Sequence, residues 1–579
     1  MGEPTSKKKV IIAAVASILL VGAIVAAVLT TRGSHEESPP DVGSTTRAVD
    51  AICAPTRFQE TCYASLQGVN TTDPKKLIEA AIEVAVTKVG NVLSESALLK
   101  AAATDPMTEG AFDVCREVLE KAVRDLRRAV DKIDVLDEGS SMKEFVADLR
   151  TWLSAVITNQ ETCIDAFQYA TGDTGQKMKN LLRTARELSS NGLAMVTDIS
   201  EFLDTLQLGD ILGGGDGTSG GSRKLMEQEQ EPEPEPEAEG DGFVTKRLLA
   251  ATALSVKPTI VVAKDGSGKF KSITDAVASI AKTIPPHTSI NGTNGTFIVI
   301  MIKAGVYDET VTIPWGLNKL VLIGAGPTAT KITGKKSVKG GVPTYSTATL
   351  AVNSDDFVAK DIGVENTAGP QGLQALAVRI SGDKSVLYNV RMDGYQDTLC
   401  ADVYRQYFRS CIISGTIDFL FGNGLTLYQD CTFITRKPAP GQECAVTAHG
   451  RSDPKSNTAL IIQNCKFTAE PGLLQVKPPV QAFLGRPWKP LSRTIIMQSH
   501  IEGFINEAGW ARWVKDVGID TCFYVEYGNK GPGANLSKRV KWKGIHTLNG
   551  QQIQSWTGGK VFTGETWIKE SGVPYSPAM

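Results

Sequence analysis

The fold is decided by three stretches that share one pattern: Tyr407-Phe-Arg-Ser-Cys-Ile-Ile-Ser-Gly, Leu427-Tyr-Gln-Asp-Cys-Thr-Phe-Ile and Ile461-Ile-Gln-Asn-Cys-Lys-Phe-Thr. Each begins with an apolar pair, continues with two polar or small residues, and ends in a second short run. Cys411 and Cys431 take the same place in successive units, 20 residues apart. A period near 20 with one strand–turn–strand unit per coil is typical of a solenoid. The pattern predicts a parallel β-helix.

The alternative to a β-helix is a β-sandwich. It would need hairpin turns between adjacent strands, and the sequence shows few of them. Neighbouring coils of a β-helix lie about 4.8 Å apart. That spacing falls within the Cα separation that a disulfide tolerates. The matched positions of Cys411 and Cys431 therefore predict a disulfide between them.

The N-terminal region indicates the secretory pathway. Three lysines, Lys7 to Lys9, precede an uncharged apolar run, Val10–Leu29. As a helix this run would be about 30 Å long, enough to cross a bilayer core. Lysines on the near side favour export of everything that follows. Residues 1–30 are therefore predicted to be a signal anchor or a cleaved signal, with a buried core helix as the alternative. A stem rich in Ser, Pro and Gly follows at residues 31–46.

Residues 47–206 show a helical pattern. They contain little proline and repeat apolar residues at three- and four-residue steps, as in Leu77-Ile-Glu-Ala-Ala-Ile. This periodicity predicts a helix bundle. Cys53 and Cys62 fit a short N-terminal hairpin. Cys115 and Cys163 lie in separate helical segments, where a disulfide would join two helices.

A linker, residues 207–250, separates the bundle from the β-helix domain, residues 251–579. It begins Gly-rich and continues as Glu-Pro repeats, a composition that cannot bury a core. Two basic tetrapeptides, Arg223–Met226 and Lys246–Leu249, flank the acidic repeats. Exposed basic sites in an extended linker are natural targets of a processing protease. The alternative is a solvated charge run without a function.

Net charge changes sign at the linker. Residues 251–579 carry a net charge of +11, whereas the first 250 residues carry −13. The basic part is expected to attract a polyanion, and the acidic part to mask it. We expect no nucleic-acid partner, and membrane contact only through the N-terminal apolar run. Ten cysteines and four glycosylation sequons also fit an exported protein. The sequons are at Asn70, Asn291, Asn294 and Asn535.

Two acidic residues are candidate catalytic groups. Asp397 lies in Gly394-Tyr-Gln-Asp-Thr-Leu, and Asp418 begins Asp-Phe-Leu-Phe-Gly 21 residues later. That separation is about one coil, so the two side chains are expected to be neighbours. Paired carboxyls in partly apolar surroundings differ in proton affinity, which provides a nucleophile and a general acid. The alternative for each aspartate is an ordinary turn residue.

The second half resembles plant pectin methylesterases, carbohydrate esterases with a right-handed β-helix. Four segments carry the resemblance in the right order: Gly305-Val-Tyr-Asp-Glu, Gln374-Ala-Leu-Ala-Val, the two aspartate motifs, and Leu484-Gly-Arg-Pro-Trp. It covers roughly residues 258–579. Departures are small: QALAV and DFLFG vary the family's QAVAL and DFIFG, and Cys400 stands where many relatives carry an aromatic residue.

The resemblance implies a role for each matched residue. Asp418 would be the nucleophile that attacks the ester carbonyl of a methylated galacturonate, and Asp397 the proton donor and acceptor. Gln396 would stabilise the oxyanion, with Gln374 lining the same pocket. Arg486 would pair with Asp418. Three further contacts are expected: Trp488 on a sugar face, Thr344 on the substrate, and Phe421 beside the pocket.

The helical region, with its four cysteines, resembles the invertase and pectin methylesterase inhibitor family of four-helix bundles. This resemblance implies the disulfides Cys53–Cys62 and Cys115–Cys163. A bundle joined to an enzyme by a cleavable linker suggests a zymogen with an intramolecular inhibitor, or a retention device. A folding aid is the alternative. Separate inhibitor proteins are further candidate partners.

The predicted activity is hydrolysis of the methyl esters of homogalacturonan, giving acidic pectin and methanol in the cell wall. It requires no cofactor or metal, because the residues supply a nucleophile, a proton donor and an oxyanion donor. Two alternatives stay open: another β-helix enzyme acting on pectin, a lyase or polygalacturonase, and a non-catalytic pectin-binding or inhibitor protein. Trp510 is a further candidate sugar platform or an ordinary buried residue.

Overall fold

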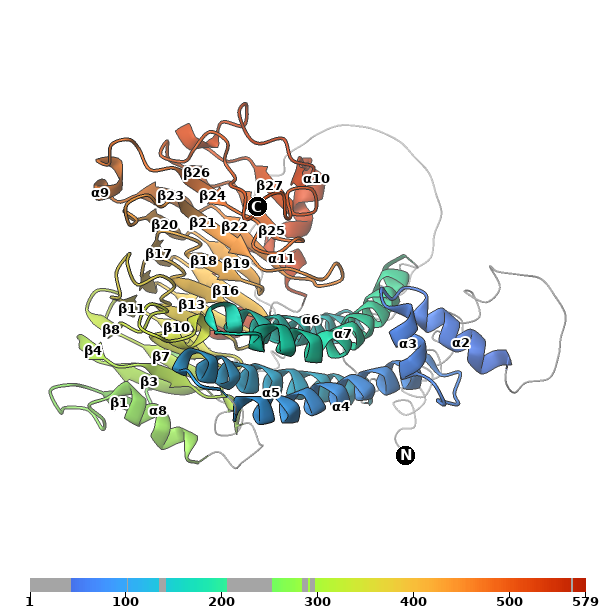
Figure 1. The fold of residues 1–579 in the computed structure, drawn as a ribbon. Coiled ribbons are helices and arrows are strands. Elements are labelled where there is room, and N and C mark those ends of the chain that lie inside the picture. Colours follow the sequence, from blue (N-terminus) through green and yellow to red (C-terminus); the bar gives the residue numbers. More distant parts are fainter. Residues whose placement is uncertain are drawn as a thin grey trace, which may run out of the picture.

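The structure, a computed structural model, describes residues 43–101, 103–134, 142–205, 253–283, 290–291, 297–563 and 566–579. The N-terminal apolar run and both basic tetrapeptides lie outside these ranges. The described chain forms a helical bundle that packs across the side of a long stack of parallel strands (Figure 1). Within these ranges no helix is long and apolar enough to cross a membrane.

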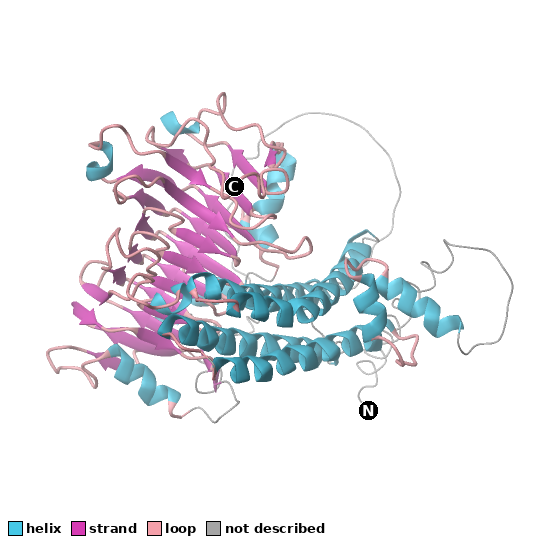
Figure 2. Ribbon diagram, in the orientation of Figure 1, coloured by secondary structure: helices cyan, strands magenta, loops and turns pink. Residues whose placement is uncertain are grey.

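Three parallel sheets build the stack (Figure 2). The eleven-stranded sheet holds β1 (Ile260–Val262), β3 (Ile298–Ile302), β7 (Leu320–Ile323), β10 (Val358–Lys360), β13 (Ser385–Tyr388), β16 (Arg405–Arg409), β19 (Leu425–Gln429), β22 (Ala459–Gln463), β25 (Arg493–Met497), β27 (Phe523–Tyr527) and β28 (Ile545–His546). The eight-stranded sheet holds β4 (Gly305–Asp308), β8 (Thr330–Gly334), β11 (Gly363–Asn366), β14 (Arg391–Asp393), β17 (Ile412–Gly415), β20 (Thr432–Thr435), β23 (Lys466–Ala469) and β26 (His500–Ile501). The seven-stranded sheet holds β5 (Val311–Ile313), β9 (Leu350–Val352), β12 (Val378–Ile380), β15 (Leu399–Ala401), β18 (Leu420–Gly422), β21 (Cys444–His449) and β24 (Ala482–Gly485). A short pair, β2 (Ile290–Asn291) and β6 (Leu317–Asn318), lies apart.

One coil contributes one strand to each sheet. From β13 the chain passes to β14, then to β15, and returns as β16 beside β13. The predicted parallel β-helix is therefore confirmed. A coil contains three strands, however, where the sequence pattern indicated two. The third strand was not recognised because strands such as β15 and β18 have only three residues, too few to show an alternating pattern.

Stacked apolar side chains fill the inside of the coils. Phe408 stacks on Tyr428 with ring centroids 4.5 Å apart, and the tilted rings of Phe433 and Phe467 lie 5.2 Å apart. The turns that precede the eight-stranded sheet repeat a left-handed backbone position, where Asn and Asp are favoured over most residues. These positions are Asp361, Asn389, Ser410, Asp430, Asn464 and Gln498. The repeated Asn and Asp of the sequence pattern are thus the corners of the coils.

Short helices pack around the stack. Helix α8 (Ile273–Ala281) lies against β1 and β5 and begins at Ser272, whose hydroxyl accepts the Asp275 N–H. At the C-terminus, apolar side chains pack on the outer face of the eleven-stranded sheet, among them Phe562 and Ile568. The remaining short elements are η2 (Ala253–Ser255), η4 (Thr344–Thr347), α9 (Pro471–Leu474), η5 (Pro532–Ala534), α10 (Gly550–Ile553), η6 (Gln554–Trp556), α11 (Gly558–Val561) and α12 (Thr566–Ser571).

The predicted helix bundle is also present. It consists of α4 (Pro74–Lys100), α5 (Pro106–Asp134), α6 (Met142–Asp165) and α7 (Thr174–Thr205), with α2 (Gly43–Cys53) and α3 (Gln59–Ser65) before them and η1 (Ala166–Tyr169) after α6. Helix α4 starts where Pro74 follows Asp73, whose carboxylate accepts the Lys75 N–H. The apolar steps read from the sequence form the core, as Leu77, Val118 and Leu119 are fully buried.

Two disulfides hold the bundle together. Cys53 is bonded to Cys62 and Cys115 to Cys163, the pairs that the family resemblance implied. The prediction of a Cys411–Cys431 bond is wrong: both thiols are free and buried, and the Cys411 N–H lies 3.4 Å from the Cys431 sulfur. Matched residues of parallel coils point the same way, so their Cβ atoms stay about 4.8 Å apart. That separation exceeds the Cβ distance of a disulfide.

Candidate active site

Asp397 and Asp418 occupy the same place in successive coils. Each lies two residues before a strand of the seven-stranded sheet, β15 or β18, and these strands pair through Leu399 and Leu420. Both aspartates have a left-handed backbone, with φ of 65° and 49°, which Asp adopts more readily than most residues. The one-coil spacing in the sequence does make them neighbours.

Arg486, which follows a strand two coils further along the same sheet, fixes the Asp418 carboxylate. Its Nε donates to Oδ1 at 2.8 Å and its terminal nitrogen to Oδ2 at 2.6 Å, a two-point ion pair that sets the orientation of the carboxylate. The arginine directly follows Gly485, the last residue of β24. A Cβ on Gly485 would lie 1.9 Å from the Thr447 hydroxyl. Only glycine therefore lets β24 approach β21 closely enough to bring Arg486 to Asp418.

The two carboxyls differ in their electrostatic surroundings. Burial raises the pKa of Asp397 well above its usual value, the negative charge of Asp418 raises it further, and Arg486 opposes this by its charge alone. Burial also raises the pKa of Asp418, but here Arg486 opposes it through both hydrogen bonds and charge. These surroundings favour the proton on Asp397 and the negative charge on Asp418.

The predicted site residues line one cavity of about 300 Å³. Those that line it are Thr344, Gln374, Gln396, Asp397, Asp418, Phe421, Arg486 and Trp488. Phe421 meets Trp488 edge to face at 5.9 Å and supports it at the rim. Motifs that are more than a hundred residues apart in the sequence therefore meet in a single concave site.

Among the lining residues that sequence reasoning missed are Trp513 and Lys489, and it left Trp510 undecided. The Trp513 ring lies 4.3 Å from the Arg486 guanidinium, and Lys489 lines the cavity next to Trp488. Trp510 is buried in the core, stacked on Tyr524 with centroids 4.2 Å apart. Lys489 was within reach of sequence reasoning because it directly follows the Leu484–Trp488 motif, whereas nothing in the sequence marks Trp513 over Trp510.

Comparison with known proteins identifies this architecture. A sequence model described as Pectinesterase matches residues 259–565, and a model described as Plant invertase/pectin methylesterase inhibitor matches residues 47–195. A probable pectinesterase/pectinesterase inhibitor of Arabidopsis thaliana is 41% identical, over 93% of this chain and 77% of that protein. The chain belongs to the pectinesterase family. A pectinesterase of Petunia integrifolia is 43% identical over 69% of this chain and 99% of its own length. A solved pectin methylesterase from carrot aligns with a TM-score of 0.53 and 41% identity, over 56% of this chain and 99% of that one.

The inhibitor-like bundle covers the cavity of the pectinesterase domain. Residues of α6 and η1 form one of its walls: Thr158, Glu161, Thr162, Asp165, Ala166, Gln168 and Tyr169. The hydroxyl of Tyr169 accepts a hydrogen bond from the Gln374 amide nitrogen at 2.8 Å. The Asn423 amide donates to Thr158 at 2.7 Å, and Lys489 pairs with Asp165 at 2.8 Å. Asp418 is only 3% exposed under this cover.

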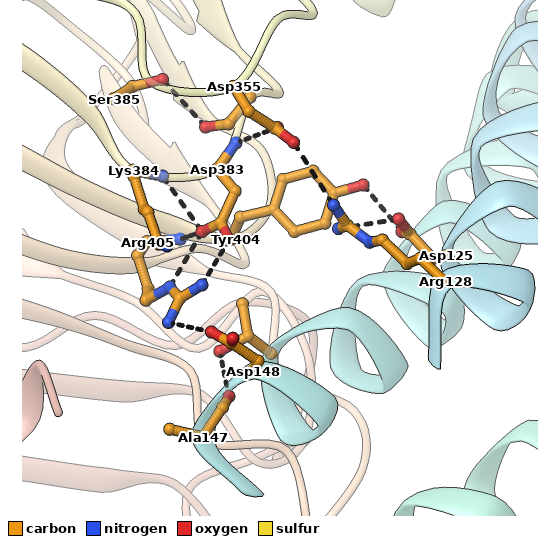
Figure 3. Close-up of polar contacts among 12 residues, drawn as sticks. Asp125, Arg128, Ala147, Asp148, Asp355, Asp383, Lys384, Ser385, Tyr404 and Arg405 are labelled. Atoms are coloured by element: carbon orange, nitrogen blue, oxygen red, sulfur yellow. Dashed lines mark hydrogen bonds and ion pairs between the residues drawn. The ribbon is translucent and has the colours of Figure 1, made fainter. Parts of the chain in front are cut away.

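A second group of contacts joins the bundle to the pectinesterase domain beside the cavity (Figure 3). The Tyr404 hydroxyl donates to Asp125 on α5 at 2.7 Å. Arg128 on the same helix reaches Asp355 at 3.3 Å. On α6, Asp148 pairs with Arg405 at 2.8 Å. Burial raises the pKa of Asp125 to about 6, although Arg128 and the Tyr404 hydroxyl oppose it. The interface therefore depends on charged groups held away from water.

Apolar packing and contacts of Lys121 complete the interface. Tyr345 of η4 packs with the apolar core of the bundle, and its hydroxyl lies 2.6 Å from Lys121 of α5. Lys121 also donates to Asn353 at 2.7 Å. A Cβ on Gly110 of α5 would lie 2.9 Å from the Pro343 ring. The α5 backbone is therefore fitted to the loop that carries Thr344.

Proposed function

We propose that the pectinesterase domain hydrolyses the methyl esters of homogalacturonan with Asp418 as nucleophile and Asp397 as proton donor and acceptor. The observation that carries this assignment is the two-point Arg486–Asp418 ion pair beside a second buried carboxyl that has no such pair. An ionised carboxylate attacks, and a protonated one donates. The family matches support the ester substrate.

The reaction takes place in two steps. A carboxylate oxygen of Asp418 forms a bond with the ester carbonyl carbon, and the carbonyl oxygen becomes an oxyanion. As this intermediate collapses, the bond to the methoxy oxygen breaks and Asp397 gives its proton to the leaving methanol. A water molecule then attacks the galacturonyl carbon of the anhydride and passes one proton to Asp397, while the bond to Asp418 breaks. The product leaves as galacturonic acid, which loses the other proton of the water to solvent, and both aspartates are restored.

The side-chain amides of the cavity stabilise the oxyanion. Gln396 precedes Asp397, and Gln374 lies in the preceding coil. An amide N–H directed at the developing negative charge typically lowers the barrier by about 3 kcal/mol. In the covered chain, that is, the uncut chain whose bundle lies over the cavity, the Gln374 amide donates to Tyr169. Trp488 and Trp513 offer flat apolar surface to the sugar faces, and Thr344 also lines the cavity.

The bundle acts in this proposal as an intramolecular inhibitor. It fills one wall of the cavity, engages Gln374 and leaves both aspartates almost without solvent contact. A polymer chain cannot enter a site that is closed in this way. Cleavage at Arg223–Met226 or Lys246–Leu249 would release the domain by removing the tether. The apolar run Val10–Leu29 would direct the chain into the secretory pathway and hold the uncut form at the membrane, with the cut enzyme acting in the cell wall.

Methanol release from methylated pectin tests the proposal. The chain is made with a site-specific protease sequence in place of Lys246–Leu249 and is assayed before and after cutting and separation. The separated domain should release methanol, and the uncut chain should release much less. Asp418→Asn should lower the rate by about a thousandfold or more. A cut wild-type enzyme that releases no methanol, but forms new reducing ends or unsaturated products, would favour a polygalacturonase or a lyase instead.

A further inference from the structure

The cavity contains one cation that the mechanism does not use. Lys489 lies in the cavity wall next to Trp488, with its ammonium 5.2 Å from the indole ring. Its side chain is only 18% exposed in the covered chain. The other cation of the cavity, Arg486, is fully engaged with Asp418 of its own domain. A half-buried ammonium requires a counter-charge, because water solvates it poorly there.

The counter-charges of Lys489 come from the bundle. Within the described ranges its ion pairs are with Asp165 at 2.8 Å and with Glu161 at 3.7 Å, both near the end of α6. The Lys489–Asp165 contact is also a hydrogen bond. When the bundle leaves, these carboxylates leave with it. The ammonium then stands in an open sugar-binding cleft, beside an aromatic platform, without its partners.

The substrate can replace those partners in only one of its two forms. A methyl-esterified galacturonate is neutral at C6, whereas a de-esterified one carries a carboxylate. Resting on the proposed esterase function, we propose that Lys489 forms a subsite for the carboxylate of a de-esterified galacturonate next to the ester under attack. Asp165 and Glu161 occupy this subsite in the covered chain. The released enzyme therefore prefers esters that have an acidic neighbour, and its own product improves the next substrate.

The substitution Lys489→Met tests the subsite, because methionine keeps the apolar stem beside Trp488 and removes the charge. Lys489→Arg is the matched control that restores a cation. Each enzyme is cut at the engineered linker site, separated from the bundle, and assayed for methanol release. The substrates are a fully methylated homogalacturonan and a half-methylated one of equal length. The measured quantity is the ratio of kcat/KM on the half-methylated polymer to kcat/KM on the fully methylated polymer.

The wild-type ratio should exceed one, and Lys489→Met should lower it about fivefold, the size expected for one partly buried charged hydrogen bond. Lys489→Arg should recover most of the ratio, and added salt should lower the wild-type ratio. A ratio that Lys489→Met leaves unchanged would overturn the subsite, even if both rates fall together. A wild-type enzyme that acts on neither polymer would instead refute the proposed function.

A binding measurement separates the two ideas further, since it requires no catalysis. A fully de-esterified oligogalacturonate carries no ester, so calorimetry with the released domain reports carboxylate recognition alone. Lys489→Met should weaken this binding about fivefold and Lys489→Arg should not. Equal binding by wild type and Lys489→Met would overturn the subsite whatever the methanol assay shows.

Discussion

Asp125 is the carboxyl through which pH is expected to control the docking of the bundle. In the docked chain it lies against Arg128 and the Tyr404 hydroxyl (Figure 3). Burial raises its pKa from 3.8 to about 6, because water no longer solvates the charged form. On an undocked bundle the same carboxyl would face water and would titrate near its ordinary value of about 3.9. Docking therefore takes up a proton.

The sign and size follow from that difference. A carboxyl with a raised pKa favours the docked state fully at low pH, and the advantage falls as pH rises from about 4 to about 6. A difference of two pKa units corresponds to about 3 kcal/mol of docking free energy in total. Between pH 5 and pH 7 the docking constant should change about tenfold, which is roughly half of that free energy. Burial lowers the pKa of Lys121 to about 8. Burial alone would raise the pKa of Glu117, but the charges of Lys121 and Arg379 outweigh it and lower that pKa to about 2. Neither group changes charge in this window. Burial also raises the pKa of Asp355, which faces Arg128, so it contributes in the same direction.

Calorimetry of the separated bundle and pectinesterase domain at pH 5, 6 and 7 measures this effect. The wild-type dissociation constant should rise about tenfold from pH 5 to pH 7. Asp125→Asn, which mimics the protonated acid, should lose most of this change and keep only the part that Asp355 contributes. Asp131→Asn, on the exposed side of the same helix, should keep the wild-type trend. The reasoning is refuted if wild-type docking does not weaken with pH, or if Asp125→Asn keeps the full change.

Three further predictions concern the site itself. Gln396→Ala should lower kcat for methanol release by about a hundredfold with little change in KM, and a change confined to KM would contradict its role at the oxyanion. Gly485→Ala should lower kcat/KM at least tenfold, because the new Cβ would meet the Thr447 hydroxyl and displace Arg486; its circular dichroism should match wild type, and full activity would show that β24 adapts. Tyr169→Ala should raise methanol release by the uncut chain several-fold, because the Gln374 amide loses its partner, and an unchanged rate would mean that this contact does not block the site.

The sequence predicted the parts of the site that depend on local repetition. Asp397 and Asp418 could be placed together because one coil separates them. Arg486 could not be placed by spacing, since it lies 68 residues beyond Asp418 across turns of unequal length. Its position was implied only by the family motif, as were those of Thr344 and Trp488. A repeat predicts which residues are neighbours one coil apart, but the error in a predicted position grows with every loop of unequal length that follows.

The docking face of the bundle could not be predicted, for a different reason. Glu117, Lys121, Asp125 and Arg128 follow one another at three- and four-residue steps on α5. Such a charged stripe is typical of a helix face in water. In the structure it faces Arg379, Tyr345, Tyr404 and Asp355. A face that pairs charge with charge has the same composition as a solvated one, so periodicity alone cannot distinguish them.

That composition also explains how a well-fitted inhibitor can be removed. Ion pairs taken out of water gain little net free energy, because the cost of desolvation offsets much of the attraction. The tether compensates for this weakness, since a flexible linker holds the bundle near the cleft at an effective concentration of about a millimolar. Cutting the linker changes no contact, yet it lets dilution separate the two parts. We therefore expect the specific activity of the cut, unseparated chain to rise on dilution, while the specific activity of the uncut chain stays constant. A cut chain whose specific activity is independent of concentration would show that the charged interface alone is sufficient to hold the bundle in place.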